Sequence, residues 1–289
     1  MKRLAALSIM CVLAGGVLSL ARPALAQTTA TSTPVLTPAP ISLDISGTSQ
    51  ADFTTQLTAL QTTYRNQLTT YRDNEKTFQI DKDQYYKIQT LASLEEAVRA
   101  TRQVMLTRAD VLLTYLTISR LTLQNTKGID TAVKTDALQQ IDTLSSDLKD
   151  YRKTVDVSQD RTALLNTAIQ FLTLNSRTTA LSRRIYLLVG YGNLQTVDDK
   201  TFAIKQELQT QVEQTETDPL VLAQKKRGLD EIQRNLDQIN PPLTKVRFAL
   251  DPVNKNNSSV TGIDFNQNFT AIYGGLSRSL SYLQEIVKN

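Results

Sequence analysis

A repeat of seven residues runs through the first part of the chain and restricts that part to a helix. Its main line consists of large side chains at an unbroken interval of seven: Leu57, Tyr64, Tyr71, Phe78 and Tyr85. A second line, three residues further on, is marked by Leu60 and Ile88. This is the a/d spacing of a helix that buries one seam against other helices. We therefore interpret the repeat as one wall of a shared helical core, which is the usual role of such a stripe.

The rest of the chain fits the same fold class. Glycine (10) and proline (8) are scarce among the 289 residues and are concentrated at a few joints, which leaves long stretches suited to helices. No stretch has a strand pattern of useful length. We predict an all-α, elongated antiparallel helical bundle, coiled-coil-like, with a disordered N-terminal spacer. The helical regions are predicted at about residues 51–126, 129–189, 197–250 and 264–288.

Glycine and proline set most of the predicted boundaries. Gly128 is expected to stop the first region, and Gly190 with Gly192 the second. In the third region Asp218-Pro219 is a cap followed by a first-turn proline, which restarts a helix, and Asn240-Pro241-Pro242 is expected to break it. The short connectors that remain predict antiparallel neighbours.

Two boundaries inside these regions are less strongly marked. Region 51–126 is predicted as one continuous helix, with a joint at Thr90–Ser93 as the alternative because Ser93–Glu96 has the form of a capping box. In the second region, the polar residues Asp156–Asp160 predict a bend.

The later regions also contain apolar lines that we expect to be buried. In the second region these residues are Leu138, Ile141, Leu144, Leu148, Tyr151, Val155, Leu165, Ile169, Leu172, Leu181, Ile185 and Leu188. The last region has two lines with a period of seven, which are Phe269, Leu276, Leu283 and Tyr273, Leu280, Val287. Gly274-Gly275 in this last region is expected to permit close helix approach.

The first residues have the pattern of a secretory signal peptide. Lys2 and Arg3 precede an apolar run, and Ala24-Leu25-Ala26 forms a cleavage site, so residues 1–26 are predicted to be removed. The alternative is a retained anchor. Residues 27–50 are rich in Thr and Pro and are predicted to be a flexible spacer before the helical bundle of residues 51–289. We predict an exported bacterial protein that is periplasmic, on the cell surface or secreted.

Removal of the signal changes the charge and the residue types that remain. The net charge of the whole chain is +4, but three basic residues leave with the signal and reduce it to +1, so the basic balance is not a nucleic-acid signature. The chain has no His, and its only Cys, Cys11, lies in the signal. Disulfides, Cys/His zinc sites, thiol nucleophiles and Ser–His arrangements are thereby excluded from the mature chain.

The remaining candidates for chemistry favour a structural interpretation. Asp81 with Asp83 and the pair Asp198-Asp199 lack the loop of a calcium site. The short basic clusters Arg183-Arg184 and Lys225-Lys226-Arg227 are typical of solvated faces. We therefore predict no catalytic residues, no metal ligands and no cofactor.

These observations favour a binding protein over an enzyme. The leading hypothesis is a non-enzymatic exported scaffold of the cell envelope that binds a protein partner, or a second copy of itself, through its helical faces. The alternative is a membrane-active helical protein that lies on a bilayer through an amphipathic helix, although we do not favour membrane association. A hydrolase that uses paired carboxylates is a third and weaker hypothesis.

Overall fold

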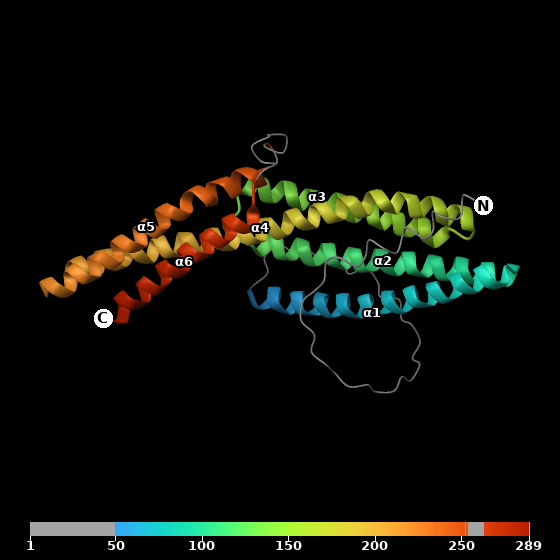
Figure 1. Cartoon of the computed structure of the whole chain (residues 1–289), viewed down its shortest axis with the longest axis horizontal. Coiled ribbons are helices and arrows are strands. Elements are labelled where there is room, and N and C mark those ends of the chain that lie inside the picture. The colour runs from blue at the N-terminus through green and yellow to red at the C-terminus, as the bar shows by residue number, and fades with distance from the viewer. Residues whose placement is uncertain (1–49, 252, 254–262, 289) are drawn as a thin grey trace, which may run out of the picture. The chain divides into compact units, whose positions relative to one another are not determined.

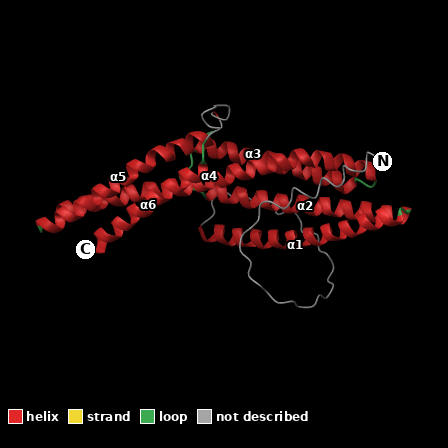
Figure 2. Ribbon diagram, viewed as in Figure 1, coloured by secondary structure: helices red, strands yellow, loops and turns green. Residues whose placement is uncertain are grey.

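The computed structural model describes residues 50–251, 253 and 263–288, all within the unit formed by residues 47–289. These residues form helices (Figures 1 and 2), joined by short links from α1 to α5, namely α1 (Gln50–Ile88), α2 (Leu91–Asn125), α3 (Thr131–Val157), α4 (Arg161–Thr215), α5 (Pro219–Leu250) and α6 (Phe265–Lys288). The predicted all-α helical bundle is confirmed. The predicted signal peptide and nearly all of the predicted spacer lie outside the described residues.

The first predicted region is two helices, so the expectation of one continuous helix over 51–126 is wrong. The chain turns at Gln89, whose φ of 52° lies in the left-handed region. Thr90 then caps α2: its hydroxyl accepts a hydrogen bond from the Ser93 amide (3.3 Å), and the Ser93 hydroxyl accepts one from the Thr90 amide (3.1 Å). This capping box begins three residues before the one that the sequence suggested, and α1 folds back along α2 (Figure 1).

The seven-residue repeat of α1 packs mainly against α2. Its five main members are only half-buried, and the Tyr64 ring lies 6.4 Å from that of Tyr115 on α2. Of the second line, Leu60 is buried, whereas Ile88 is 54% exposed at the turn. The repeat therefore forms one side of a two-helix seam, not a wall of a core shared by several helices.

The other helices form two bundles that share α4. The first part of α4 packs with α2 and α3, and its last part packs with α5 and α6 (Figure 1). Arg–Asp ion pairs join the helices of the first bundle. Arg152 on α3 contacts Asp110 on α2 at 2.6 Å, and Arg120 on α2 contacts Asp142 on α3 at 2.8 Å. Each helix supplies one arginine and one aspartate ten residues apart, so these pairs match only the antiparallel register.

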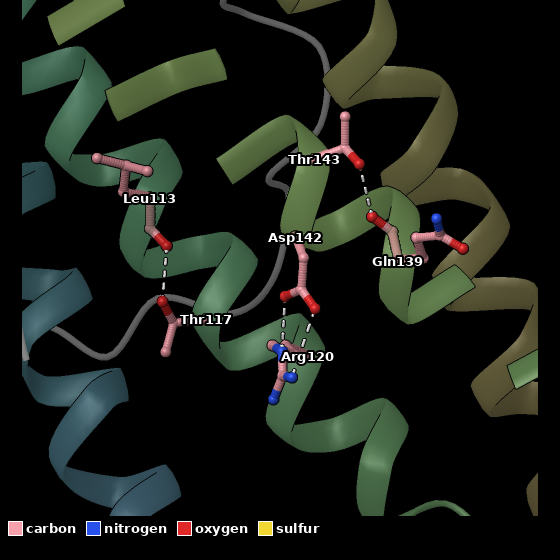
Figure 3. A network of polar contacts seen from close by, with 6 residues as sticks. All are labelled: Leu113, Thr117, Arg120, Gln139, Asp142 and Thr143. Carbon is pink, nitrogen blue, oxygen red and sulfur yellow. Dashed lines mark hydrogen bonds and ion pairs between the residues drawn. The ribbon is translucent and has the colours of Figure 1, made fainter. Parts of the chain in front are cut away.

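Figure 3 shows one of these ion pairs in its surroundings. The Arg120 guanidinium reaches across from α2 to both carboxylate oxygens of Asp142 on α3. On either side, the hydroxyls of Thr117 and Thr143 donate to carbonyls of their own helices, Leu113 and Gln139, at 2.9 Å. Because each threonine hydroxyl donates to a carbonyl of its own helix, it does not need a hydrogen-bond acceptor on the neighbouring helix.

The predicted helix stop at Gly190 and Gly192 is wrong, because α4 continues through both residues to Thr215. For the same reason the connector and new helix start expected near Val197 do not exist. Gly192 serves close packing: a Cβ there would lie 2.5 Å from the Lys127 carbonyl oxygen in the α2–α3 link. Gly128 in that link, with φ of 73°, meets the Gly192 carbonyl oxygen in the same way. Two glycines thus let a loop cross directly over a helix.

The apolar stripe of α4 changes sides near Gly190. Before it the buried residues keep steps of three and four: Leu164, Thr167, Phe171, Leu174, Thr178, Leu181, Ile185 and Leu188. The stripe then advances by three residues to Tyr191 and again to Leu194 before the alternation resumes. Each three-residue step turns the stripe by about 60°, because the helix has 3.6 residues per turn. Three such steps in succession from Ile185 turn it by about 180°, so α4 faces α2 and α3 first and α5 and α6 afterwards.

The prolines of α5 do not break it, contrary to prediction. Pro241 and Pro242 lie inside the helix, and the flanking Ile239 and Leu243 are buried at 2% and 4% exposure. Tertiary packing on both sides of the proline pair holds the helix in place despite the missing amide donors. The restart at Asp218-Pro219 is confirmed, with the Asp218 carboxylate accepting from the Leu220 amide at 2.8 Å.

The remaining predictions of helix boundaries and of buried residues were correct only in part. Asp156–Asp160 contains a true helix break, and Asp160 caps α4. The last helix is confirmed to within a residue at its start. Most of the predicted core of α3 is buried, but several apolar residues expected inside are exposed, which are Leu165, Ile169 and Leu172 on α4 and Tyr273, Leu280 and Val287 on α6.

The crossing of the loop over α4 generates a stability prediction. Gly192→Ala should lower the free energy of unfolding by about 1–3 kcal/mol, because the new methyl must displace the Lys127 carbonyl and the Ile129 side chain. The matched control is Gly274→Ala on α6, where an added Cβ meets only the Arg278 side chain at 3.9 Å. That variant should gain up to about 1 kcal/mol from helix propensity. Urea denaturation measures both, and equal shifts in the two variants would contradict the packing role of Gly192.

Candidate functional site

The residues that the sequence singled out for chemistry do not form one site. The half-buried Tyr64 packs against Tyr115, and burial raises the pKa of its hydroxyl. The Arg183-Arg184 cluster is divided: Arg184 turns toward α3, while Arg183 is exposed. In the second cluster Lys225 pairs with Glu216 at 3.0 Å, and this hydrogen bond lowers the pKa of Glu216. One residue of each basic cluster is therefore held in an ion pair, and neither cluster acts as a single basic patch.

A groove of about 640 Å³, with polar side chains from both helices among its lining residues, lies between α3 and α4. Its floor is a network in which Arg184 contacts Asp136 at 2.6 Å and the Gln140 amide also donates to Asp136. One guanidinium nitrogen of Arg184, Nη2, is buried without a hydrogen-bond partner among the described residues. The groove offers guanidinium and amide groups but no nucleophile beside a base, so its chemistry suits binding to a polar surface.

Next to this groove, α4 presents an apolar face to solvent. Leu165, Ile169 and Leu172 are 40%, 58% and 53% exposed, and their spacing of four and three places them on one side of the helix. The exposed Arg183 lies on the same side, about five turns after Leu165 and three after Leu172. The exposed Arg161 lies about one turn before Leu165. This set of five residues is called the α4 outer face below.

The α4 outer face has a distinctive charge. The sequence contains no Asp or Glu between Asp160 and Asp198, so every formal charge on α4 in that stretch is an arginine. Arg177 and Arg184 are paired with Asp147 and Asp136 of α3, each at 2.6 Å. No described ion pair involves Arg161 or Arg183. The face is therefore apolar at its centre and basic at both ends.

A second exposed apolar line lies on α6. Tyr273, Leu280 and Val287 are 68%, 40% and 69% exposed, although their spacing of seven led us to expect them in the core. The buried residues of α6 are instead centred on Ile272, Leu276, Ser279, Leu283 and Ile286, which pack toward α5. The sequence pattern detected both lines but did not show which of them the chain itself covers.

Polar groups that range from buried Tyr191 to exposed Asp199 lie where the two bundles meet. The Tyr191 hydroxyl donates to the Gln195 side chain at 3.2 Å, and the Gln195 amide donates to Asp199 at 2.9 Å. Burial raises the pKa of the neighbouring Asp198, and the charge of Asp199 raises it further. Burial also raises the pKa of Tyr191. This arrangement has an evident structural role, since it lies directly beside the Gly128–Gly192 crossing.

Three further findings bear on function. Within the described ranges, no three carboxylate, histidine or cysteine side chains gather in a way that could hold a metal ion. None of the helices in these ranges combines the length and apolar character needed to cross a membrane. The chain matches no protein-family model, no curated protein and no solved structure.

The raised pKa of Asp198 predicts an unusual pH dependence. Because the folded state binds this proton more tightly than the unfolded chain, the contribution of Asp198 to stability is present at low pH and is lost as the pH rises through the folded pKa. Asp198→Asn should therefore raise the free energy of unfolding at pH 7, by well under about 1 kcal/mol for a half-buried group.

The measurement is urea denaturation at pH 7 and at pH 3, where the gain should vanish. The matched control is Asp230→Asn, which neutralises an exposed carboxylate on α5. A loss of stability for Asp198→Asn at pH 7 would show that the charged form is the one that the junction needs.

Proposed function

We propose that this protein is a non-enzymatic exported helical scaffold that binds a protein partner through the α4 outer face. The observation that supports this most directly is the exposed apolar triplet Leu165, Ile169 and Leu172 between two basic ends. Burying such side chains on association is favourable by roughly 25 cal/mol per Å² of apolar surface, which gives a partner a reason to bind there. The absence of His from the sequence, and of Cys beyond residue 11, also favours binding over catalysis.

The spacing and charge of the face indicate its partner. Residues at steps of four and three accept the knobs of another helix, as in a coiled-coil seam. Arg161 and Arg183, with no acidic residue on the same stretch of α4, favour a helix whose flanks are acidic. We therefore propose an amphipathic helix with acidic flanking residues as the segment of the partner that docks on α4.

Export is supported by the N-terminal pattern of residues 1–26, and the spacer of residues 27–50 would then separate the cleavage site from the bundle. The proposal thus combines the location suggested by the sequence with the uncovered face seen on α4.

An anionic membrane surface is the second candidate for the same face. The observation in its favour is that exposed arginines flank exposed apolar groups on a stretch of α4 without acids, and that Tyr186, on the same helix, is 76% exposed. Basic amphipathic helices with aromatic groups lie in the headgroup region of bilayers. Three apolar side chains are a small anchor, however, and we favour the protein partner.

Site-specific photocross-linking in living cells separates these functions. A benzophenone amino acid in place of Ile169 should give a protein adduct of one discrete mass, because the side chain lies at the centre of the face. In place of Gln170, an exposed residue that lies about 100° further around the helix and so outside this face, it should give none. Adding Leu165→Asp and Leu172→Asp to the Ile169 derivative should remove the adduct.

Two outcomes would count against partner binding. Equal labelling at positions 169 and 170 would mean that contact is non-specific. An Ile169 derivative that labels lipid only, together with co-sedimentation of the purified protein with anionic vesicles at physiological salt, would favour the membrane alternative.

A further inference from the structure

Helix α6 has two overlapping seams, and the chain covers only one of them. The inner seam consists of Ile272, Leu276, Ser279, Leu283 and Ile286, all buried. The outer seam runs Tyr273, Leu276, Leu280, Leu283 and Val287, with steps of three and four throughout. Leu276 and Leu283 belong to both and are 2% and 5% exposed, whereas the other three are exposed. The outer seam is therefore a direct continuation of the α5–α6 interface.

The outer seam is free of charge. The charged residues of α6 are Arg278, Glu285 and Lys288. Arg278 is held on the α5 side by a hydrogen bond from its Nε to Asn235 Oδ1 at 3.2 Å, and Glu285 lines a cavity of about 190 Å³ between α5 and α6. The residues beside the outer seam on its exposed edge are Ser277, Gln284 and, in the last turn, Lys288, so the five seam residues themselves are uncharged and one cation lies beside their C-terminal end. A face without charge can meet an identical face without repulsion, which a two-fold interface requires.

The spacing of the exposed residues has its own symmetry. Tyr273 and Val287 lie seven residues before and after Leu280. In an antiparallel pair of identical helices with the two-fold axis at Leu280, each Tyr273 meets Val287 of the other copy, and the two Leu280 side chains meet at the axis. A large side chain is thus placed opposite a smaller one at both ends.

We propose that the outer seam of α6 is a self-association surface on which a second copy of this chain docks through its own α6, antiparallel, with Leu280 at the two-fold axis. This goes beyond the function proposed above, because it uses a different helix and a different partner. The face offers three exposed apolar side chains per copy, against roughly 20–30 residues a side in a standard interface, so the dimer should be weak, with a dissociation constant of about 1–100 µM.

Sedimentation equilibrium of the full chain over a concentration series tests the surface. The unchanged protein should show a monomer–dimer equilibrium. Leu280→Arg should weaken it at least about tenfold, because two guanidinium groups then face each other at the axis. The matched control, Ile169→Arg on α4, should leave it unchanged.

Cysteine cross-linking tests the geometry and does not depend on a variant that disrupts the seam. With Cys11→Ser in every protein, Leu280→Cys should oxidise to a disulfide-linked dimer. A mixture of Tyr273→Cys and Val287→Cys proteins should form the mixed dimer, whereas Val287→Cys alone should not.

A monomer at all concentrations, or a dimer equally weakened by Ile169→Arg, would overturn the proposal. A linked dimer from Val287→Cys alone would do the same for the antiparallel arrangement. The photocross-link at position 169 is scored on a different helix, so failure of either proposal leaves the test of the other intact.

Discussion

The arrangement of α2, α3, α5 and α6 around α4 depends on one close contact between backbones. The α2–α3 link passes over α4 at Gly192, where the Lys127 carbonyl oxygen would lie 2.5 Å from any Cβ, and Gly128 in the link leaves equal room for the Gly192 carbonyl oxygen. This crossing lies where the stripe of α4 turns to its other side. A single helix can then belong to two bundles: it presents one face to α2 and α3, and the opposite face to α5 and α6.

The reversal of α4 also explains which parts of the fold were predictable. Glycine after an apolar run usually ends a helix, and Gly190 and Gly192 follow one, so a stop was the natural interpretation. The glycines were needed for an approach by a distant segment, which no local pattern contains. Local signals succeeded where their cause was local: the Asp218 cap and the Pro at the first position of α5 are satisfied within a few residues.

The uncovered faces escaped prediction for a related reason. Periodicity identified Leu165, Ile169 and Leu172 and the line through Leu280 as stripes, and stripes are usually core. A helix with two apolar lines needs two neighbours, and periodicity does not count neighbours. In α4 the inner line is covered by α2 and α3, and in α6 by α5, which leaves the other line of each helix in contact with solvent. Each candidate site is therefore an apolar line that the sequence pattern identified correctly but that was predicted to be buried and is exposed.

The two uncovered faces differ in charge, and each therefore suits a different kind of partner. The α4 outer face has arginines at both ends and no acid, so two copies of it would repel each other, and it requires a partner of the opposite charge. The outer seam of α6 has no charge and a spacing symmetric about Leu280, so it is compatible with itself. Because the first face lies on the part of α4 that packs with α2 and α3 and the second lies on the helix paired with α5, the two can be occupied independently. A dimer formed through α6 would present two α4 faces, and a partner with two acidic helices would then bind with the added strength of a linked pair of contacts.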